Sequence, residues 1–178
     1  MVLGPMAASC RTLCGRSTIV LEPMANKVSL IDTFADRIVG WRVSRSAKTD
    51  FVLDALEQTL HDRRPVQKSG LVHHSDRGGQ YLSMRYTERL AESGIEPSVG
   101  SVGDSYDNAL AETINGLYKT ELVHRQGPWR NMPDLEMATL GRVDWFNNRR
   151  LLGPIGNIPP AESEENFYAQ RDVLDMVA

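Results

Sequence analysis

Long apolar runs are missing from this chain. None of its segments approaches the roughly 18 consecutive apolar residues of a membrane-spanning helix. A secretory signal is also missing, because Arg11 and Arg16 come late and no apolar block follows a charged start. The hydrophobic fraction of 41% and the charged fraction of 24% are ordinary for a folded globular domain. We therefore expect a cytoplasmic chain with a single core.

Cysteine and excess positive charge are scarce as well. Cys10 and Cys14 are the only cysteines, and no second pair or nearby histidine follows them, which predicts two free thiols rather than a zinc site. The formal net charge is -3, whereas proteins that bind nucleic acid are usually basic. This expectation does not hold for a metal-dependent nuclease, because such an enzyme needs an acidic centre and can bind DNA through local clusters of basic residues. The basic clusters here are local, at residues 63–64, 125–130 and 149–150.

Hydrophobic periodicity predicts an α/β chain from residue 28 onward. Alternating side chains predict a hairpin of strands at residues 28–33 and 38–43, and shorter strands at residues 71–75 and 95–99. Helical stripes and caps predict helices at about residues 49–62, 83–94, 107–124, 134–148 and 160–171. Residues 1–27 show no sustained period, apart from a possible short strand at residues 17–21. This order favours a mixed sheet with helices on both faces.

Two acidic residues and a lysine stand at positions that suit phosphodiester chemistry. Asp76 follows a predicted strand and precedes an Arg-Gly-Gly loop, Glu112 lies in a predicted helix with 35 residues between the two, and Lys119 follows seven residues later. Carboxylates are the ligands that Mg²⁺ and Mn²⁺ require, and two such ions about 4 Å apart clamp the attacking and leaving oxygens. A lone Asp after a strand is usually a turn former and a lone helical Glu is usually solvated. The combination, however, is hard to produce by accident.

Three motifs resemble one family of proteins. They are His-Ser-Asp-Arg-Gly-Gly-Gln-Tyr at residues 74–81, Asp-Asn-Ala-Leu-Ala-Glu at residues 107–112, and the Asp-to-Trp segment at residues 32–41. They look like the OrfB-type transposases of bacterial insertion sequences, which have a retroviral-integrase-like catalytic core. The resemblance runs from about residue 28 to residue 167, and the ending at residues 145–162 is also similar. That ending departs from the family pattern by lacking a histidine and by having Pro159 in place of a threonine.

The resemblance implies an RNase H-like mixed sheet flanked by helices, and a polynucleotidyl transferase with an acidic triad and two Mg²⁺ or Mn²⁺ ions. It assigns the second and third triad positions to Asp76 and Glu112, and a contact with terminal DNA to Lys119. The implied activity is DNA strand cleavage and transfer in transposition, on transposon ends and target DNA, by a homo-oligomer.

Weaker candidates for DNA contact remain open. Tyr106 precedes the Glu112 helix and could reach DNA, but it could equally pack on that helix. Arg149 and Arg150 form a plausible phosphate patch, although a solvated helix end is about as plausible.

The N-terminal part departs from the family. Residues 1–31 contain no Asp, and Glu22 is their only acid, so the first triad Asp is not found. Asp32 matches a position that is not part of the triad. We divide the chain into an atypical segment (residues 1–27), an integrase-like core (residues 28–152) and a tail with a short helix (residues 153–178), with the first strand lost or replaced by residues 17–21. We interpret the chain as a truncated or frame-altered copy.

The missing Asp predicts weak metal binding and little strand transfer, because Asp76 and Glu112 would face each other with less compensation. Whether Asp32 or Glu22 replaces the missing carboxylate stays open at this point. One alternative function is an inactive remnant that binds DNA or pairs with intact transposase subunits. A free-standing RNase H-type nuclease is another, and the same missing Asp counts against it.

Overall fold

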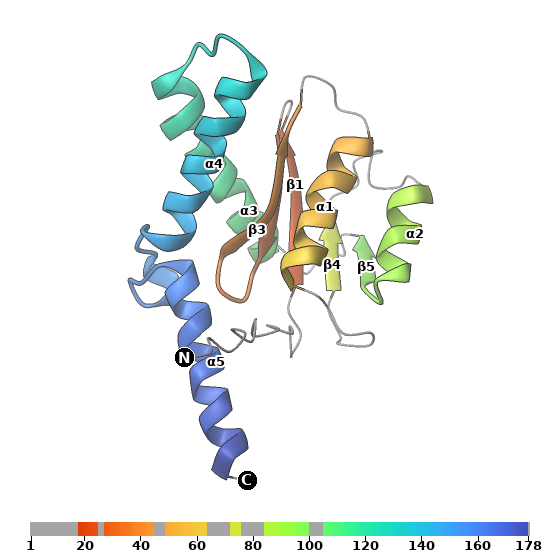
Figure 1. Ribbon diagram of the computed structural model, residues 1–178, viewed down its shortest axis with the longest axis vertical. Coiled ribbons are helices and arrows are strands. Elements are labelled where there is room, and N and C mark those ends of the chain that lie inside the picture. The colour runs from red at the N-terminus through yellow and green to blue at the C-terminus, as the bar shows by residue number, and fades with distance from the viewer. Residues whose placement is uncertain are drawn as a thin grey trace, which may run out of the picture.

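The sheet and its helices are seen in a computed structural model that describes residues 18–24, 27–44, 49–63, 72–75, 84–99 and 105–177 (Figure 1). The sheet has five strands in the order β3-β2-β1-β4-β5. Their bounds are β1 Thr18–Met24, β2 Lys27–Asp32, β3 Arg37–Val43, β4 Val72–Ser75 and β5 Glu96–Val99. β1 pairs with β2 in the antiparallel sense and with β4 in the parallel sense, so the sheet is mixed as predicted.

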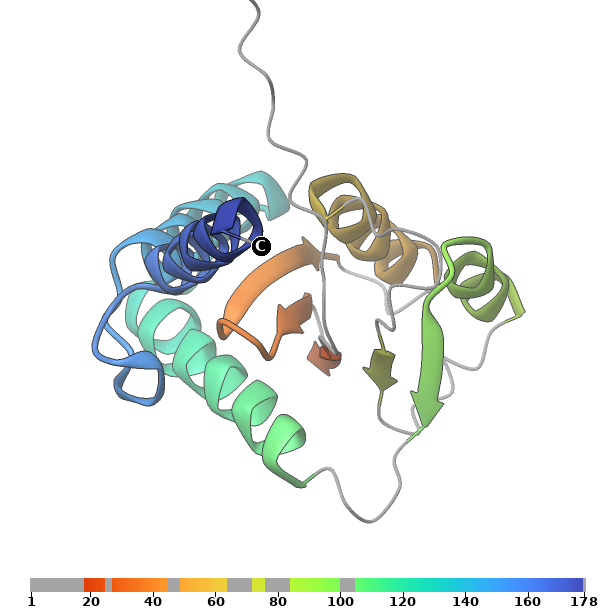
Figure 2. The ribbon, with the colours of Figure 1, turned by 90° about the horizontal axis from the view of Figure 1, so that it is seen from below.

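The helices cover both faces of this sheet. They are α1 Thr49–Arg63, α2 Met84–Glu92, α3 Ser105–Tyr118, α4 Met132–Asn148 and α5 Pro160–Val177, with a π-helical turn η1 Lys119–His124 after α3 and a 3-10 turn η2 Gly153–Ile155. Figure 2 shows α1 and α2 on one side of the strands and α3, α4 and α5 on the other. Across the described ranges, every helix is too short or too polar to cross a lipid bilayer.

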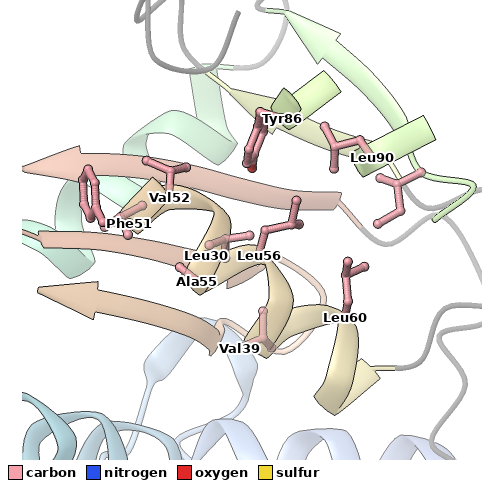
Figure 3. Packing of buried hydrophobic residues seen from close by; sticks show 11 residues of the cluster. Leu30, Val39, Phe51, Val52, Ala55, Leu56, Leu60, Tyr86 and Leu90 are labelled. Atoms are coloured by element: carbon pink, nitrogen blue, oxygen red, sulfur yellow. The ribbon is translucent and has the colours of Figure 1, made fainter. Parts of the chain in front are cut away.

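Strand β2 supplies both halves of the core. Leu30 packs under α1 with Leu56 (Figure 3), and Val28 belongs to the same cluster. Ile31 faces the opposite cluster, which contains Phe146 of α4. This is the period-2 alternation that the sequence predicted, with both faces covered. Full burial of each of these large apolar side chains stabilises the fold by about 1.5–3 kcal/mol, so β2 anchors both helical layers.

Helix α1 lies unusually close to β3 at Gly40. A Cβ atom at this position would lie 2.3 Å from both the carbonyl oxygen of Ala55 and the hydroxyl oxygen of Thr59. No side chain fits there without moving the backbone of α1. The glycine therefore fixes how closely the helix approaches the sheet.

The predicted short strand at residues 17–21 is present and longer than expected. As β1 it spans Thr18–Met24 and lies at the centre of the sheet, so β2 has a partner on each side and no edge is exposed there. The register pairs Pro23 with Val28, which places a proline in a central strand. Proline lacks the N–H that a strand ladder uses, and this is why the pattern alone underestimated the strand.

A buried cluster of charges attaches α5 to the sheet. Arg63, at the end of α1, pairs with Glu164 of α5 and lies 3.3 Å from the Asp32 carboxylate, and Arg37 also pairs with Glu164. Arg63, Asp32 and Glu164 are each about 1% exposed. Arg63, the first residue of the local basic cluster at residues 63–64, is therefore a buried ion-pair partner. Burial raises the pKa of Asp32 and lowers the pKa of Arg63, and their attraction for each other offsets part of each shift.

Candidate active site

The candidate site is built at the carboxyl ends of β1 and β4. These strands run parallel, and their register pairs Leu21 with Ser75. The next residue along β1 is Glu22, and the next residue after β4 is Asp76. Asp76 lies outside the described residues. Since neighbouring strands lie about 4.8 Å apart, the register brings the backbone of Glu22 to the edge at which β4 ends.

Helix α3 brings Glu112 toward the same part of the sheet. α3 packs against β1. Near its start Leu110 packs against the cluster that contains Ile31, and further along Asn115 contacts Lys27 at the beginning of β2. Glu112 lies between these two contacts along the helix. In the β1–β2 register Glu22 pairs with Ser29, which follows Lys27 by two residues along β2.

Glu112 flanks the buried side of α3 and keeps its carboxylate exposed. Lys119 follows two helical turns later on the same side, and it opens the π-helical turn η1. Single π-helical turns are frequent at functional sites. Within the described part of the chain, Glu112 and Lys119 take part in none of the ion pairs, so both charges face outward and remain available to ligands.

The other candidates for DNA contact are placed differently. Tyr106 lies in the first turn of α3, but its side chain is outside the described residues. Arg150 donates to both carboxylate oxygens of Glu121, at 2.9 and 3.0 Å. Arg149 is exposed and lies 3.5 Å from Asp144. Of the two arginines, Arg149 is the freer to meet a phosphate.

Asp32 does not lie at this edge. β2 runs antiparallel to β1 and pairs Asp32 with Ile19, near the start of β1, so Asp32 lies away from the carboxyl end of that strand. Its Oδ1 atom accepts a hydrogen bond from the Phe34 N–H at 3.1 Å, and its Oδ2 atom faces Arg63. Asp32 therefore serves the attachment of α5, and Glu22 is the remaining acid of the first two strands.

The two histidines before Asp76 are both buried. The Nε2 atom of His73 lies 2.9 Å from the Tyr86 hydroxyl, and burial lowers the pKa of His73 to about 3, so the imidazole is neutral at physiological pH. His73 thus packs between β4 and α2. His74 is 1% exposed and also has a partner.

Lys27 is a residue of this region that the sequence reading did not single out. It is buried at the β1–β2 turn, next to α3. A lysine at the tip of a polar hairpin normally extends into solvent, so its type gave no signal. Only the packing of α3, 88 residues away along the chain, encloses it.

Carboxylates are hard oxygen donors and suit Mg²⁺ or Mn²⁺. Among the described residues no group of three potential ligands surrounds a metal position, and Asp76 is not one of those residues. Glu22, Asp76 and Glu112 are nevertheless of the carboxylate type that such an ion takes. The exposed carboxylate of Glu112 fits a ligand that enters from solvent.

Two family models match this chain, and each is described as an integrase core domain. The first matches residues 24–105 and the second matches residues 93–160. The chain belongs to the integrase core domain family. Together the two matches run through β4 and α3 of the candidate site, and they begin at Met24, the last residue of β1.

Relatives of this integrase core domain are transposases of insertion sequences. The chain is 58% identical over 149 residues to the transposase for insertion sequence element IS629 of Shigella sonnei, covering 84% of the chain and 49% of the relative. It is 56% identical over 143 residues to the putative transposase for insertion sequence element IS986/IS6110 of Mycobacterium tuberculosis (strain ATCC 25177 / H37Ra), covering 79% of the chain and 51% of the relative. The chain thus spans about half the length of the curated relatives it matches.

Solved structures show the same fold. The catalytic core domain of BIV integrase aligns with a TM-score of 0.68 at 17% identity, covering 88% of this chain and 99% of that one. The HTLV-2 integrase catalytic core domain in complex with magnesium aligns with a TM-score of 0.60 at 16% identity, covering 86% and 99%. The integrase core domain described here therefore has the RNase H-like fold of retroviral integrase catalytic cores, as the resemblance implied.

Proposed function

We propose that this chain is the catalytic core of a metal-dependent DNA transposase, and that Glu22 stands in the place of the first triad carboxylate. The register of β1 and β4 carries the proposal, because it puts Glu22 one residue past the pair formed by Leu21 and Ser75. Glu112 approaches from α3, which packs against β1. Glu22, Asp76 and Glu112 would then hold the divalent ions.

In this proposal the residues of the chain have separate roles in binding metal and DNA. When bound, two divalent ions supply charge stabilisation to the attacking and leaving oxygens of a phosphodiester. The three carboxylates would hold these ions, and the exposed ammonium group of Lys119 would hold a DNA phosphate beside them. Arg149 would extend this contact along the DNA backbone. Transposon ends and target DNA are the proposed partners of a homo-oligomer acting in the cytoplasm.

A glutamate at the first position should impair this site without abolishing it. Its side chain is one methylene longer than aspartate, so the carboxylate reaches about 1.5 Å further from the backbone. A displacement of about 1 Å at a reacting centre can cost on the order of 100-fold in rate. The longer side chain of Glu22 is thus a physical reason for the weak metal binding and low strand transfer expected from the sequence.

Metal-dependent nicking of a labelled DNA duplex tests the proposal. With Mn²⁺ present, Glu22→Asp should raise the rate by about 100-fold over the chain as it stands. Asp76→Asn and Glu112→Gln, each introduced into the Glu22→Asp background, should abolish that gain. Glu162→Gln, at an exposed acid on α5, is the matched control and should leave the rate unchanged. Nicking that is unaffected by all of these changes would contradict the proposed site. Tight DNA binding without nicking in any variant would instead identify a DNA-binding remnant.

A further inference from the structure

Lys27 places a cationic group in the interior without an acidic partner. The side chain is 2% exposed. Its Nζ atom donates to Oδ1 of Asn115 across 3.5 Å and lies 3.9 Å from the centroid of the Tyr118 ring. Within the described part of the chain, both neighbours are neutral, and no carboxylate pairs with the lysine. A buried ammonium group without an opposite charge is costly, so its presence calls for a physical account.

Both neutral partners belong to α3, between the two residues assigned to the site. Asn115 is one turn beyond Glu112, and Tyr118 directly precedes Lys119. One turn of three residues advances about 4.5 Å along a helix axis. Lys27 thus contacts α3 midway between the proposed metal ligand and the proposed phosphate contact.

The charges around Lys27 make its protonation adjustable near neutral pH. Burial, and then repulsion from Arg142 of α4, lower the pKa of Lys27 to about 7. Arg142 is itself paired with Glu121 of η1, which also binds Arg150, so that acid is already engaged. On α3, burial raises the pKa of Tyr118, so that ring stays neutral.

We propose that Lys27 is a positioning residue of the candidate site: its side chain, seated on Tyr118 and Asn115, holds α3 against the β1–β2 hairpin and so fixes Glu112 relative to β1. This rests on the proposed function for Glu112. The cationic form is attracted to the ring face and to the amide oxygen, whereas the neutral amine loses the attraction to the ring. Burial outweighs this attraction, because it lowers the pKa of Lys27 to about 7, so protonation weakens the packing and the helix is held less firmly below pH 7 than above it.

Amide NMR spectra of α3 test the coupling without any metal. Between pH 5.5 and 9, the amide signals of Glu112 and Asn115 should shift with a midpoint near pH 7. Lys27→Met and Lys27→Arg should both remove this midpoint. Asn115→Asp should move it to higher pH, because a carboxylate beside the lysine favours the charged form. The proposal is overturned if the same midpoint persists in Lys27→Met, since another group would then be titrating.

Mn²⁺ affinity of the full chain is the second measurement. At pH 8, Lys27→Met should weaken binding by about tenfold, as changes to groups that orient metal ligands do. Lys27→Arg should not rescue it, because a guanidinium stays charged where burial favours a neutral group. Unchanged affinity in Lys27→Met would overturn the positioning role. An NMR midpoint together with no Mn²⁺ binding in any variant would support the coupling of Lys27 to α3 and refute the proposed metal site. Circular dichroism would confirm that each variant is folded.

Discussion

Strand β2 buries a charged side chain at each end, Lys27 where it begins and Asp32 where it ends. Asp32 meets Arg63, which is in turn paired with Glu164. Lys27 meets an amide and an aromatic ring. The end of β2 with the ion-paired Asp32 attaches α5 to the sheet. The end with Lys27, which has no ion-pair partner among the described residues, lies against α3, the helix that carries Glu112.

Buried charges therefore have two different roles at the two ends of β2. Where the opposite charges meet, removing one partner leaves the other buried and uncompensated, so the cluster specifies a single arrangement of α1, β2 and α5. Where the charge meets only neutral groups, a change of one proton alters the contact. Structural attachment and adjustable positioning are thus separated along a six-residue strand.

Removing the shared cation at the paired end should have the largest effect on stability. Arg63→Met leaves the carboxylates of Asp32 and Glu164 buried near each other without that guanidinium, and should lower the free energy of unfolding by about 3–5 kcal/mol. Urea unfolding of the variant and the parent chain measures this loss. Arg42→Met is the matched control, because Arg42 is 41% exposed and pairs with Asp54 and Glu136 at the surface. That control should cost about 0–1 kcal/mol. Equal losses in the two variants would remove the distinction between buried and surface pairs.

The buried Lys27 at the start of β2 should make the free energy of unfolding depend on pH. The pKa of Lys27 is lowered from 10.5 to about 7 in the folded chain, so between these values the unfolded chain binds more protons and stability rises with pH. From pH 7 to pH 9 the parent chain should gain about 2 kcal/mol relative to Lys27→Met. Below pH 7 the two stability curves should run parallel. Unfolding curves collected at several pH values test this, and parallel curves over the whole range would mean that Lys27 titrates normally.

Most elements of the fold could be predicted from the sequence, because their patterns are local. The hairpin, the strands before Asp76 and Gly100 and the helix of Glu112 appear within a few residues of their predicted bounds. The pattern could not show that residues 18–24 form the central strand, because Glu22 and Pro23 interrupt the apolar run. Its place is decided by pairing with β2 and β4.

The candidate site was less accessible to sequence reading than the fold. Asp76, Glu112 and Lys119 stood out through their motifs. The sequence did not show which acid accompanies them. Choosing between Glu22 and Asp32 needs the register, since both lie on strands and differ in the edge that they approach. The buried pair of Arg63 and Glu164 joins residues 101 positions apart, and no local pattern reveals such a contact.

Calorimetric titration of Mn²⁺ into the full chain tests the central claim, that Glu22 completes the carboxylate set, most directly. The account predicts weak binding by the chain as it stands, binding about tenfold tighter in Glu22→Asp, and none in Asp76→Asn. Glu22→Ala should bind more weakly than the parent chain. If Glu22→Ala and Glu22→Asp both bind Mn²⁺ with the parent affinity, Glu22 is not a ligand and the register argument fails.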